Sequence, residues 1–377
     1  MAWIKILACL VLGARHGLAH PPGMEEKVYQ HAATPLNHRT PHISQCHGAL
    51  KEPAFVKRTV ERRNAEFDRL RRERGLAHQD HPLRPRQNKL EEFINKSHQV
   101  KKPFTKDTKA SELFADDGAC MMAPLVSEGP LYVAGEEVRR DITGGERGVP
   151  TTLDVQVIDV NTCKPIQNAA VDIWGCNTTG IYSGVWTYYR RPDGDASYDR
   201  SVINATSLRG IQFTDEEGVA AFDTNFPGHY QGRAVHLHVM VHLGATKQPN
   251  GTITGGTVAH ITQIYFDQSL ITQVEKFPPY TLNQQNLTTN ANDGLLKITT
   301  LSDDPFVRYV LLGNKIEDGI FSYIRLGIDP GAHYDVHPAA FRDSSGGHQN
   351  PAGPGGDGSK PPSLPPNPEP TWKAKTP

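Results

Sequence analysis

Eight short apolar runs between about residues 118 and 329 limit what this chain can fold into. Each run is bounded by Gly, Asn, Asp or Pro, which favour turns, and few of them show the 3.6-residue period of a helix. The predicted strands cover residues 153–157, 170–174, 219–222, 234–242, 257–267, 296–301, 306–312 and 320–328. Many short strands separated by turn signals predict a mainly β fold, an antiparallel β-sandwich.

The composition argues against two classes of protein. Lys and Arg total 40 and Asp and Glu total 41, so the formal net charge is -1. Proteins dedicated to nucleic acids or membrane surfaces normally carry a basic excess. No internal apolar run approaches the roughly 20 residues that span a bilayer. We therefore expect neither a nucleic-acid partner nor an integral membrane segment.

The N-terminal residues 1–19 have the features of a secretory signal peptide. Lys5 supplies a positive charge, residues 6–14 are apolar, and Gly17 and Ala19 are small residues at the positions that matter for cleavage. The sequence therefore predicts a secreted protein. Five Asn-X-Ser/Thr sequons fit N-glycosylation in that compartment. They are Asn95, Asn177, Asn204, Asn250 and Asn286.

Two flanking segments surround the predicted core domain of residues 118–330. Residues 20–117 form an N-terminal extension with a predicted helix at about 54–75, which Gly75 would end. Residues 57–89 hold eleven Lys or Arg against five Asp or Glu, so this helix is basic. Residues 331–377 are rich in Gly and Pro, and we expect a low-complexity tail without a fold there, disordered from about residue 343.

Four cysteines remain after Cys9, which lies in the signal peptide. Cys163 and Cys176 flank the predicted strand 170–174, which would hold them too far apart to bond. We expect each of them to pair with Cys46 or Cys120, as an oxidising compartment allows.

The stretch from Phe226 to His238 (FPGHYQGRAVHLH) contains the first chemically informative pattern. Side chains two residues apart on a strand point the same way, so His236 and His238 share a face and can bind one metal ion. Tyr230 and Arg233 lie just before this strand. A His-X-His pair alone is weak support, because structural or exposed histidines explain most of them.

A second pattern lies at residues 171–184, where a predicted strand runs into a glycine-punctuated loop that presents Tyr182. Taken together, these residues resemble the intradiol ring-cleavage dioxygenases, and most closely their secreted fungal branch. The resemblance covers about residues 118–330. Its most specific part is residues 208–238, supported by residues 174–184 and 260–267.

The resemblance implies a ferric ion on a β-sandwich. Carried over residue by residue, its ligands would be Tyr182, Tyr230, His236 and His238. Arg233 and Gln263 match positions that line the family's substrate site. Phenolate is a hard anionic ligand that suits Fe³⁺, and the metal charge favours ionised tyrosine.

The implied reaction is cleavage of a catechol by dioxygen between the two hydroxylated carbons, giving a muconic-acid-type product. Tyr230 would leave the metal and accept a proton as the catechol binds. Arg233 would stabilise negative charge on the substrate, and Gln263 would orient the substrate or hydrogen-bond a ligand.

Some residues depart from the pattern or fall outside it. Several family members have Tyr-Pro where this chain has Phe226 and Pro227. Gly175 stands where the secreted branch often has His before the cysteine. His229 and His242 match no functional position, and we expect them to be exposed. His260 begins a strand, and we expect a structural role.

Two other functions compete with the dioxygenase prediction. A secreted β-sandwich could keep the fold as a binding or structural module without turnover. A zinc or copper hydrolase could use the two histidines, but it lacks an evident Glu general base and leaves the tyrosines unexplained. The basic helix at 54–75 could also pair two subunits into a homodimer, although a secreted form could be monomeric.

Overall fold

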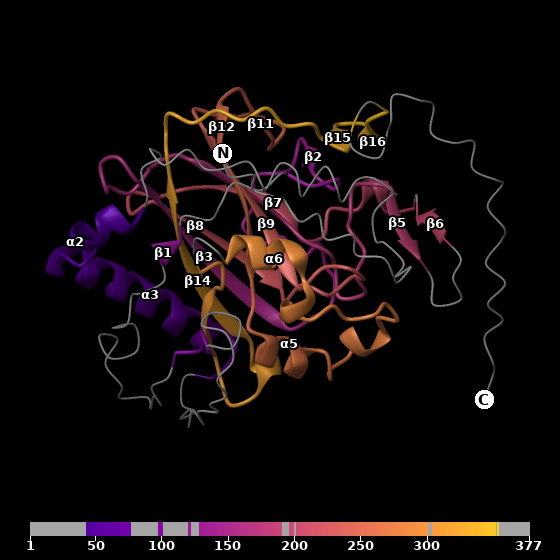
Figure 1. The fold of residues 1–377 in the computed structure, drawn as a ribbon, viewed down its shortest axis with the longest axis horizontal. Helices are drawn as coiled ribbons and strands as arrows, with labels where there is room; N and C mark the ends of the chain where they lie inside the picture. The colour runs from indigo at the N-terminus through magenta and orange to yellow at the C-terminus, as the bar shows by residue number, and fades with distance from the viewer. Residues whose placement is uncertain are drawn as a thin grey trace, which may run out of the picture.

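A computed structural model describes residues 43–76, 97–100, 120–121, 128–190, 196–199, 201–300, 304–351 and 353. Two β-sheets dominate it (Figure 1). The first sheet has the order β1 (Cys120–Met121), β14 (Ile320–Ile328), β3 (Pro150–Asp159) and β8 (Val219–Asn225), with β13 (Arg308–Leu311) also paired to β14. The second has the order β12 (Thr257–Tyr265), β9 (His236–Leu243), β4 (Ala170–Trp174) and β7 (Arg209–Phe213).

The two sheets pack face to face through one apolar core. Alternate residues of each strand point inward, as the two-residue period of a strand requires. Leu153 and Ile324 of the first sheet share this core with Ile173 and Val239 of the second. The predicted mainly β sandwich is confirmed.

The first sheet differs from the prediction in strand direction. β3 runs antiparallel to β8 but parallel to β14, and β1 also runs parallel to β14. Parallel neighbours need a long connection, and here most of the core domain lies between β3 and β14. The alternation within a strand carries no information about the direction of its partner.

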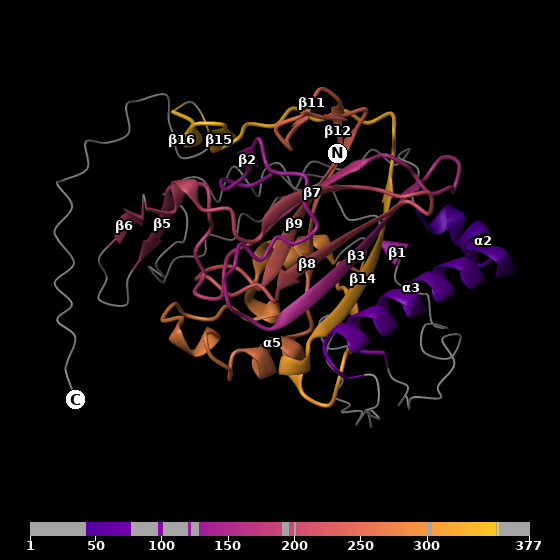
Figure 2. The same ribbon diagram turned by 180° about the vertical axis from the view of Figure 1, so that it is seen from behind.

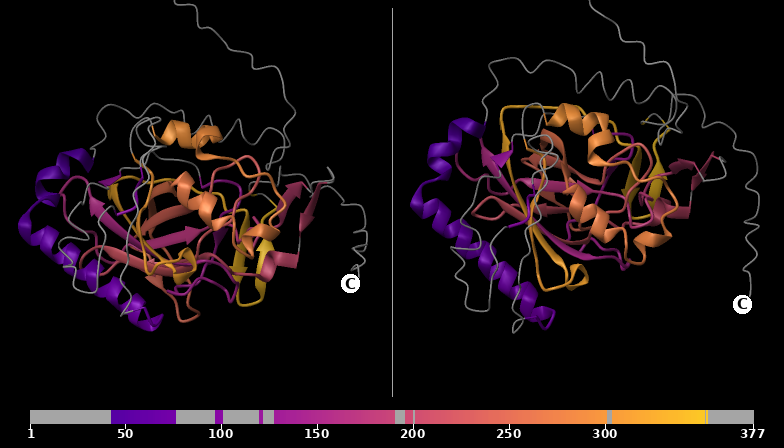
Figure 3. Two further views of the ribbon diagram at one scale, coloured as in Figure 1. Left: turned by 90° about the horizontal axis from the view of Figure 1, so that it is seen from below. Right: turned by 60° about the horizontal axis from the view of Figure 1, so that its bottom comes forward.

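The helices and the remaining strands complete the described fold. They are η1 (Ile43–Cys46), α2 (His47–Leu50), α3 (Pro53–Glu73), β2 (Val133–Ala134), β5 (Thr187–Arg190), β6 (Ala196–Asp199), η2 (Ser201–Asn204), β10 (Thr246–Lys247), β11 (Ile253–Thr254), α5 (Gln268–Val274), η3 (Tyr280–Leu282), η4 (Asn290–Asn292), α6 (Gly294–Thr299), η5 (Ile316–Asp318), β15 (Ala340–Asp343) and β16 (Gly346–Gln349). Helices α5 and α6 (orange) lie apart from α3 (indigo) in Figure 3.

The strand predicted at residues 296–301 is wrong, because α6 occupies Gly294–Thr299. One carboxylate oxygen of Asp293 accepts hydrogen bonds from the backbone N–H groups of Leu295 and Leu296 at the start of this helix. A short apolar run does not distinguish helix from strand, and the capping carboxylate stabilises the helix here.

The predicted N-terminal helix is confirmed as α3, with Pro53 in its first turn and Gly75 just after its end at a φ of +67°. Val60, Phe67 and Leu70 pack against β13 and β14. Figure 2 shows α3 lying alongside β3 and β14. The helix therefore covers the outer face of the first sheet of its own chain.

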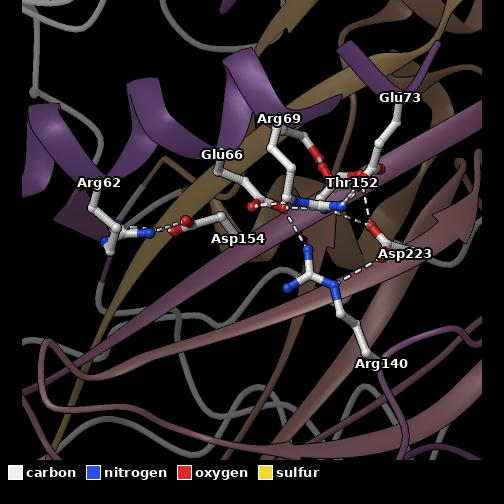
Figure 4. Close-up of polar contacts among 9 residues, drawn as sticks. Arg62, Glu66, Arg69, Glu73, Arg140, Thr152, Asp154 and Asp223 are labelled. Carbon is white, nitrogen blue, oxygen red and sulfur yellow. Dashed lines mark hydrogen bonds and ion pairs between the residues drawn. The ribbon is translucent and has the colours of Figure 1, made fainter. Parts of the chain in front are cut away.

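Several charged side chains of α3 face this sheet (Figure 4). Arg62 bonds to Asp154 of β3, and Glu66 bonds to Arg140 and Arg69. Arg140 also donates to Asp223 of β8 at 2.8 Å. Part of the basic character of the helix is thus matched by carboxylates within the same chain.

The cysteine prediction is half right. Cys46 and Cys163 form a disulfide with a Cα–Cα distance of 5.2 Å. Cys176 is a buried free thiol whose Sγ donates to the carbonyl of Gly228 at 3.2 Å. It follows β4 of the second sheet, whereas Cys120 lies on β1 of the first, so the predicted partner is on the other layer of the sandwich.

Part of the segment predicted to lack a fold, residues 331–377, is folded. Residues 340–349 form the β15–β16 hairpin, and β15 pairs in parallel with β2. Ala339 and Ala340 pack with Tyr132 and Val133, which gives this segment an apolar anchor despite its Gly and Pro content. Residues 354–377 and the predicted signal peptide at 1–19 lie outside the described residues.

In the described part of the chain, no helix combines the length and the apolar character that a bilayer crossing needs.

Candidate metal centre

Strand β9 holds the two predicted histidine ligands on the outer face of the second sheet. Leu237, between them, points into the core, and His236 and His238 point to the opposite face. Both imidazoles are 2 % exposed, and their Nε2 atoms are 3.2 Å apart. Two imidazole nitrogens that bind one ion at about 2.1 Å lie roughly 3.0–3.4 Å apart when the angle at the metal is near 90–110°.

The surroundings of each histidine fix its orientation. His236 donates from Nδ1 to the carbonyl of Ala234 at 2.6 Å, which leaves the Nε2 lone pair for a metal. The ring of His238 stacks on Trp174 of β4, with centroids 4.8 Å apart and planes 6° apart. Gly129, at a φ of +74°, covers His238 closely, and a Cβ there would lie 3.2 Å from its Cε1.

The two predicted tyrosine ligands approach the histidines from two loops. Tyr182 follows β4, and Tyr230 precedes β9. The ring centroids are 5.6 Å apart between Tyr182 and Tyr230, 5.7 Å between Tyr230 and His236, and 6.2 Å between Tyr182 and His238. The structure therefore brings together all four predicted ligands, which we call the ligand quartet. That they bind a metal stays a prediction.

The chemistry of the ligand quartet fits a hard trivalent cation. Burial raises the pKa of the Tyr182 phenol well above its usual value of 10, and it also raises the pKa of Tyr230. Without a cation both phenols stay protonated, whereas a bound cation favours the phenolates. In the described part of the chain, no three His, Cys, Asp or Glu side chains are grouped to hold a metal ion.

Arg233 lies beside the ligand quartet with several partners. Its Nη2 donates to Gln263 Oε1 at 2.6 Å and to the hydroxyl of Tyr265 at 2.9 Å, and that hydroxyl donates to Gln263 Oε1 at 2.7 Å. Gln263 stands opposite His238 in the β9–β12 pairing, and its Nε2 lies 3.5 Å from His238 Nδ1. Arg233 and Gln263 thus lie where the sequence places them, next to the ligands.

Asp293 and Tyr265 are site residues that the sequence analysis missed. Asp293 Oδ2 accepts from Arg233 Nε at 2.9 Å and from the N–H of Ala234 at 2.8 Å. Burial lowers the pKa of Arg233, but the Asp293 carboxylate raises it, and the net shift is upward. Asp293 stands just before an apolar run, which is a signal for the start of a helix. The strand predicted at residues 296–301 conflicted with this signal.

The prediction that His229 and His242 are exposed is wrong. His229 is buried and bonds through Nδ1 to Glu275 and through Nε2 to the carbonyl of Gln285, both at 2.8 Å. His242 is buried on the same face of β9 as the ligands, with Nε2 3.8 Å from Asp172 Oδ2. For His229, polar partners inside the fold make this burial possible, and residue spacing does not reveal them. His260 is buried, and burial lowers its pKa to about 4.

The two departures from the family pattern fall on the core side of the site. Phe226 packs on Phe266 in the sandwich core, with ring centroids 4.6 Å apart. A Cβ at Gly175 would lie 2.5 Å from Leu237 Cδ2, so a side chain at this position would require the Leu237 side chain to shift. Neither position belongs to the ligand quartet.

Comparison with known proteins gives a consistent picture. The profile of a family described as Dioxygenase matches residues 126–304. Catechol 1,2-dioxygenase of Acinetobacter baylyi is 35% identical over 112 residues, which are 28% of this chain and 32% of that protein. Catechol 1,2-dioxygenase of Acinetobacter guillouiae is 28% identical over 148 residues, 36% of this chain and 47% of that protein. The chain therefore spans a third to a half of the length of these curated relatives.

Among solved structures, an intradiol ring-cleavage dioxygenase from Tetranychus urticae is similar to this chain. The two are 30% identical in sequence over 57% of this chain and 98% of the other, with a TM-score of 0.47. Residues 126–304, which the family profile matches, include the ligand quartet and Arg233.

Proposed function

Because this chain belongs to the intradiol ring-cleavage dioxygenase family, we propose that it cleaves catechol-type rings with dioxygen between the two hydroxylated carbons. The ligand quartet would hold one ferric ion for this reaction. The observation that carries the proposal is the meeting of two buried phenols and two buried imidazoles on one face of β9 and its adjoining loops. The products would be muconic-acid-type diacids.

A ferric ion held by the ligand quartet would supply Lewis acidity toward the catechol oxygens. The protein residues bind and orient the substrate around that centre. Tyr230 Oη, as a phenolate, accepts a proton from a catechol hydroxyl. Arg233, fixed by Asp293, Gln263 and Tyr265, stabilises negative charge that builds on the substrate.

The direct test is oxygen uptake by the purified protein with catechol, together with chromatographic identification of muconate. One oxygen molecule consumed for each muconate formed supports the proposal. A protein that binds iron but consumes no oxygen with any member of a panel of substituted catechols would instead be the module without turnover. The same panel identifies the preferred ring substituents.

We further propose that the protein is exported and glycosylated, as in the secreted fungal branch that its motifs resemble. The features of residues 1–19 and the Cys46–Cys163 disulfide support export. Asn250 and Asn286 are exposed, whereas Asn177 Oδ1 accepts hydrogen bonds from Thr179 and Ile181 within its own loop.

Expression in a eukaryotic secretory host tests this second proposal. We expect the protein in the medium to begin at His20 and to lose mass on treatment with N-glycosidase. Asn250→Gln should remove one glycan, and Asn177→Gln should leave the glycan mass unchanged. Retention of the uncleaved, unmodified chain inside the cell would contradict it.

A further inference from the structure

A fully buried arginine lies next to the ligand quartet. Arg209 is the first residue of β7 and stands opposite Trp174 in the β4–β7 pairing. Its side chain is 1 % exposed. An arginine is rarely buried this far unless its charge and its N–H groups are matched, because removal from water is unfavourable. Its partners therefore indicate what it does.

Two of those partners are backbone carbonyls on different segments. Arg209 Nε donates to the carbonyl of Ser183 at 2.7 Å, and Nη2 donates to the carbonyl of Leu131 at 2.7 Å. Ser183 directly follows Tyr182, and Leu131 belongs to the segment that covers the outer face of the second sheet. A planar guanidinium can make both bonds in one fixed geometry. It thereby ties the loop of Tyr182 to a rigid strand.

The same guanidinium also lies near the Tyr182 side chain. The central carbon of the Arg209 guanidinium is 5.9 Å from the centroid of the Tyr182 ring. That distance is within the range of cation–π contacts, which are stronger where water is excluded. Arg209 thus contacts the backbone just after this residue and also its aromatic ring.

Glu136 is a buried carboxylate close to the third nitrogen of the Arg209 guanidinium. Its Oε1 lies 3.7 Å from Arg209 Nη1, and both side chains are buried. The two hydrogen bonds to backbone carbonyls leave the guanidinium little freedom to rotate.

We propose that Arg209 is a positioning residue for the metal centre, which fixes the loop and the ring of Tyr182 where the ligand quartet meets, and that Glu136 holds Arg209 in place. The consequence for iron rests on the proposed function. The positioning of the Tyr182 loop by Arg209 does not depend on iron, so it applies to the metal-free protein too.

Arg209→Lys is the informative variant. Lysine keeps the positive charge, but it has no planar guanidinium to donate both hydrogen bonds to the two carbonyls. Arg325→Lys is its matched control. Arg325 is also buried, lies 5.2 Å from the Phe55 ring and donates to Gln156 Oε1 at 2.9 Å, but it belongs to β14 of the other sheet. Both variants remove a buried guanidinium, and only one of them touches the Tyr182 loop.

Amide hydrogen exchange of the metal-free proteins is the first measurement. The N–H of Gly184, bonded to the carbonyl of Val202 at 2.8 Å, reports on the loop. We expect its exchange to be at least about tenfold faster in Arg209→Lys, relative to β14 amides, and unchanged in Arg325→Lys. Equal exchange in wild type and Arg209→Lys overturns the proposal. If Arg209→Lys does not fold, Glu136→Gln takes its place, with faster Gly184 exchange as the expected result and wild-type exchange as the overturning one.

Iron binding is the second measurement. We expect Arg209→Lys to bind ferric iron about 10- to 100-fold more weakly, as with other residues that orient metal ligands, and to shift the tyrosinate-to-iron absorption band. A wild-type affinity and band in this variant also overturn the proposal. If the wild-type protein itself shows no band, the proposed function fails, and the exchange comparison still decides the role of Arg209.

Discussion

Arg233 donates its Nε to Asp293 Oδ2 across 2.9 Å, and both side chains lie inside the protein. The same Asp293 oxygen accepts the N–H of Ala234, two residues before His236, and the other oxygen accepts N–H groups at the start of α6. One carboxylate therefore joins the first turn of α6 to the entrance of β9. It aims Arg233 Nη2 toward Gln263 and Tyr265.

Asp293→Asn tests this arrangement. The amide removes the charge that holds Arg233, and charge-assisted hydrogen bonds contribute roughly 1.5–3 kcal/mol. We expect kcat/KM for catechol to fall by about 10- to 100-fold in oxygen-uptake assays, with the iron absorption band retained. Asp318→Asn is the control, because Asp318 also bonds to a backbone N–H at a helix start, that of Lys315, far from the site. Unchanged kcat/KM in Asp293→Asn would show that Arg233 does not need this partner.

Tyr230→Phe tests whether Tyr230 is a metal ligand. Phenylalanine has no oxygen to bind a metal, so we expect weaker iron binding, loss of most of the colour and loss of turnover. Tyr280→Phe is the matched control, because Tyr280 is a buried tyrosine whose hydroxyl donates to the carbonyl of Phe226 at 2.6 Å. Metal analysis and visible spectra of both variants give the answer. Full colour and full rate in Tyr230→Phe would remove this residue from the ligand set.

His98 predicts a pH-dependent contribution to stability. It is fully buried and bonds through Nδ1 to Asp267 and through Nε2 to Asp304. Burial lowers its pKa, but the bonds to the two carboxylates raise it, and the net shift is upward from 6.5. The folded state therefore holds its proton more tightly than the unfolded state. This stabilisation is fully present below pH 6.5 and is lost as the pH rises through the folded-state pKa.

Urea unfolding of wild type and His98→Gln between pH 5 and about pH 9 measures this contribution. We expect the difference in unfolding free energy between the two proteins to be largest at the acid end and to shrink toward the alkaline end. His229, whose pKa is also raised, keeps its own pH dependence in both proteins and cancels in the difference. A difference that stays constant with pH would mean that His98 is not charged in the folded state.

The Cys46–Cys163 disulfide predicts a large redox effect on stability. It connects residues 117 apart in sequence and anchors η1 to the turn after β3. Removing a bond that closes so long a loop destabilises a protein by roughly 2–5 kcal/mol. We expect Cys46→Ser/Cys163→Ser to unfold at lower urea concentration, and reductant to lower the wild-type midpoint but not that of the variant. Equal midpoints for wild type and variant would contradict the disulfide.

Local patterns in the sequence were sufficient for part of this structure. The alternation around His236 and His238 predicts their common face, and residues 170–174 and 320–328 match β4 and β14 to the residue. The helix predicted at about 54–75 corresponds to α3, because a helix of 21 residues shows its period clearly. The loop residues Tyr182 and Tyr230 were found through the family resemblance and not through a local pattern.

Contacts between distant segments could not be predicted in this way. Asp293 lies 60 residues from Arg233 in the chain, and Ser183 lies 26 residues from Arg209. The parallel pairing of β3 with β14 and the burial of His229 by Glu275 depend in the same way on tertiary packing. None of these partners has a spacing that a strand or helix period would reveal, so only the folded structure identifies them.

The most direct test of the central claim is a visible absorption spectrum combined with metal analysis of the purified protein. Two tyrosinates and two imidazoles on one ferric ion predict a reddish protein with one iron per chain and a tyrosinate-to-iron charge-transfer band. Removing the metal with a chelator should abolish the band, and adding ferric iron should restore it. A colourless protein that carries stoichiometric zinc, or that takes up ferric iron without the band, would contradict the account.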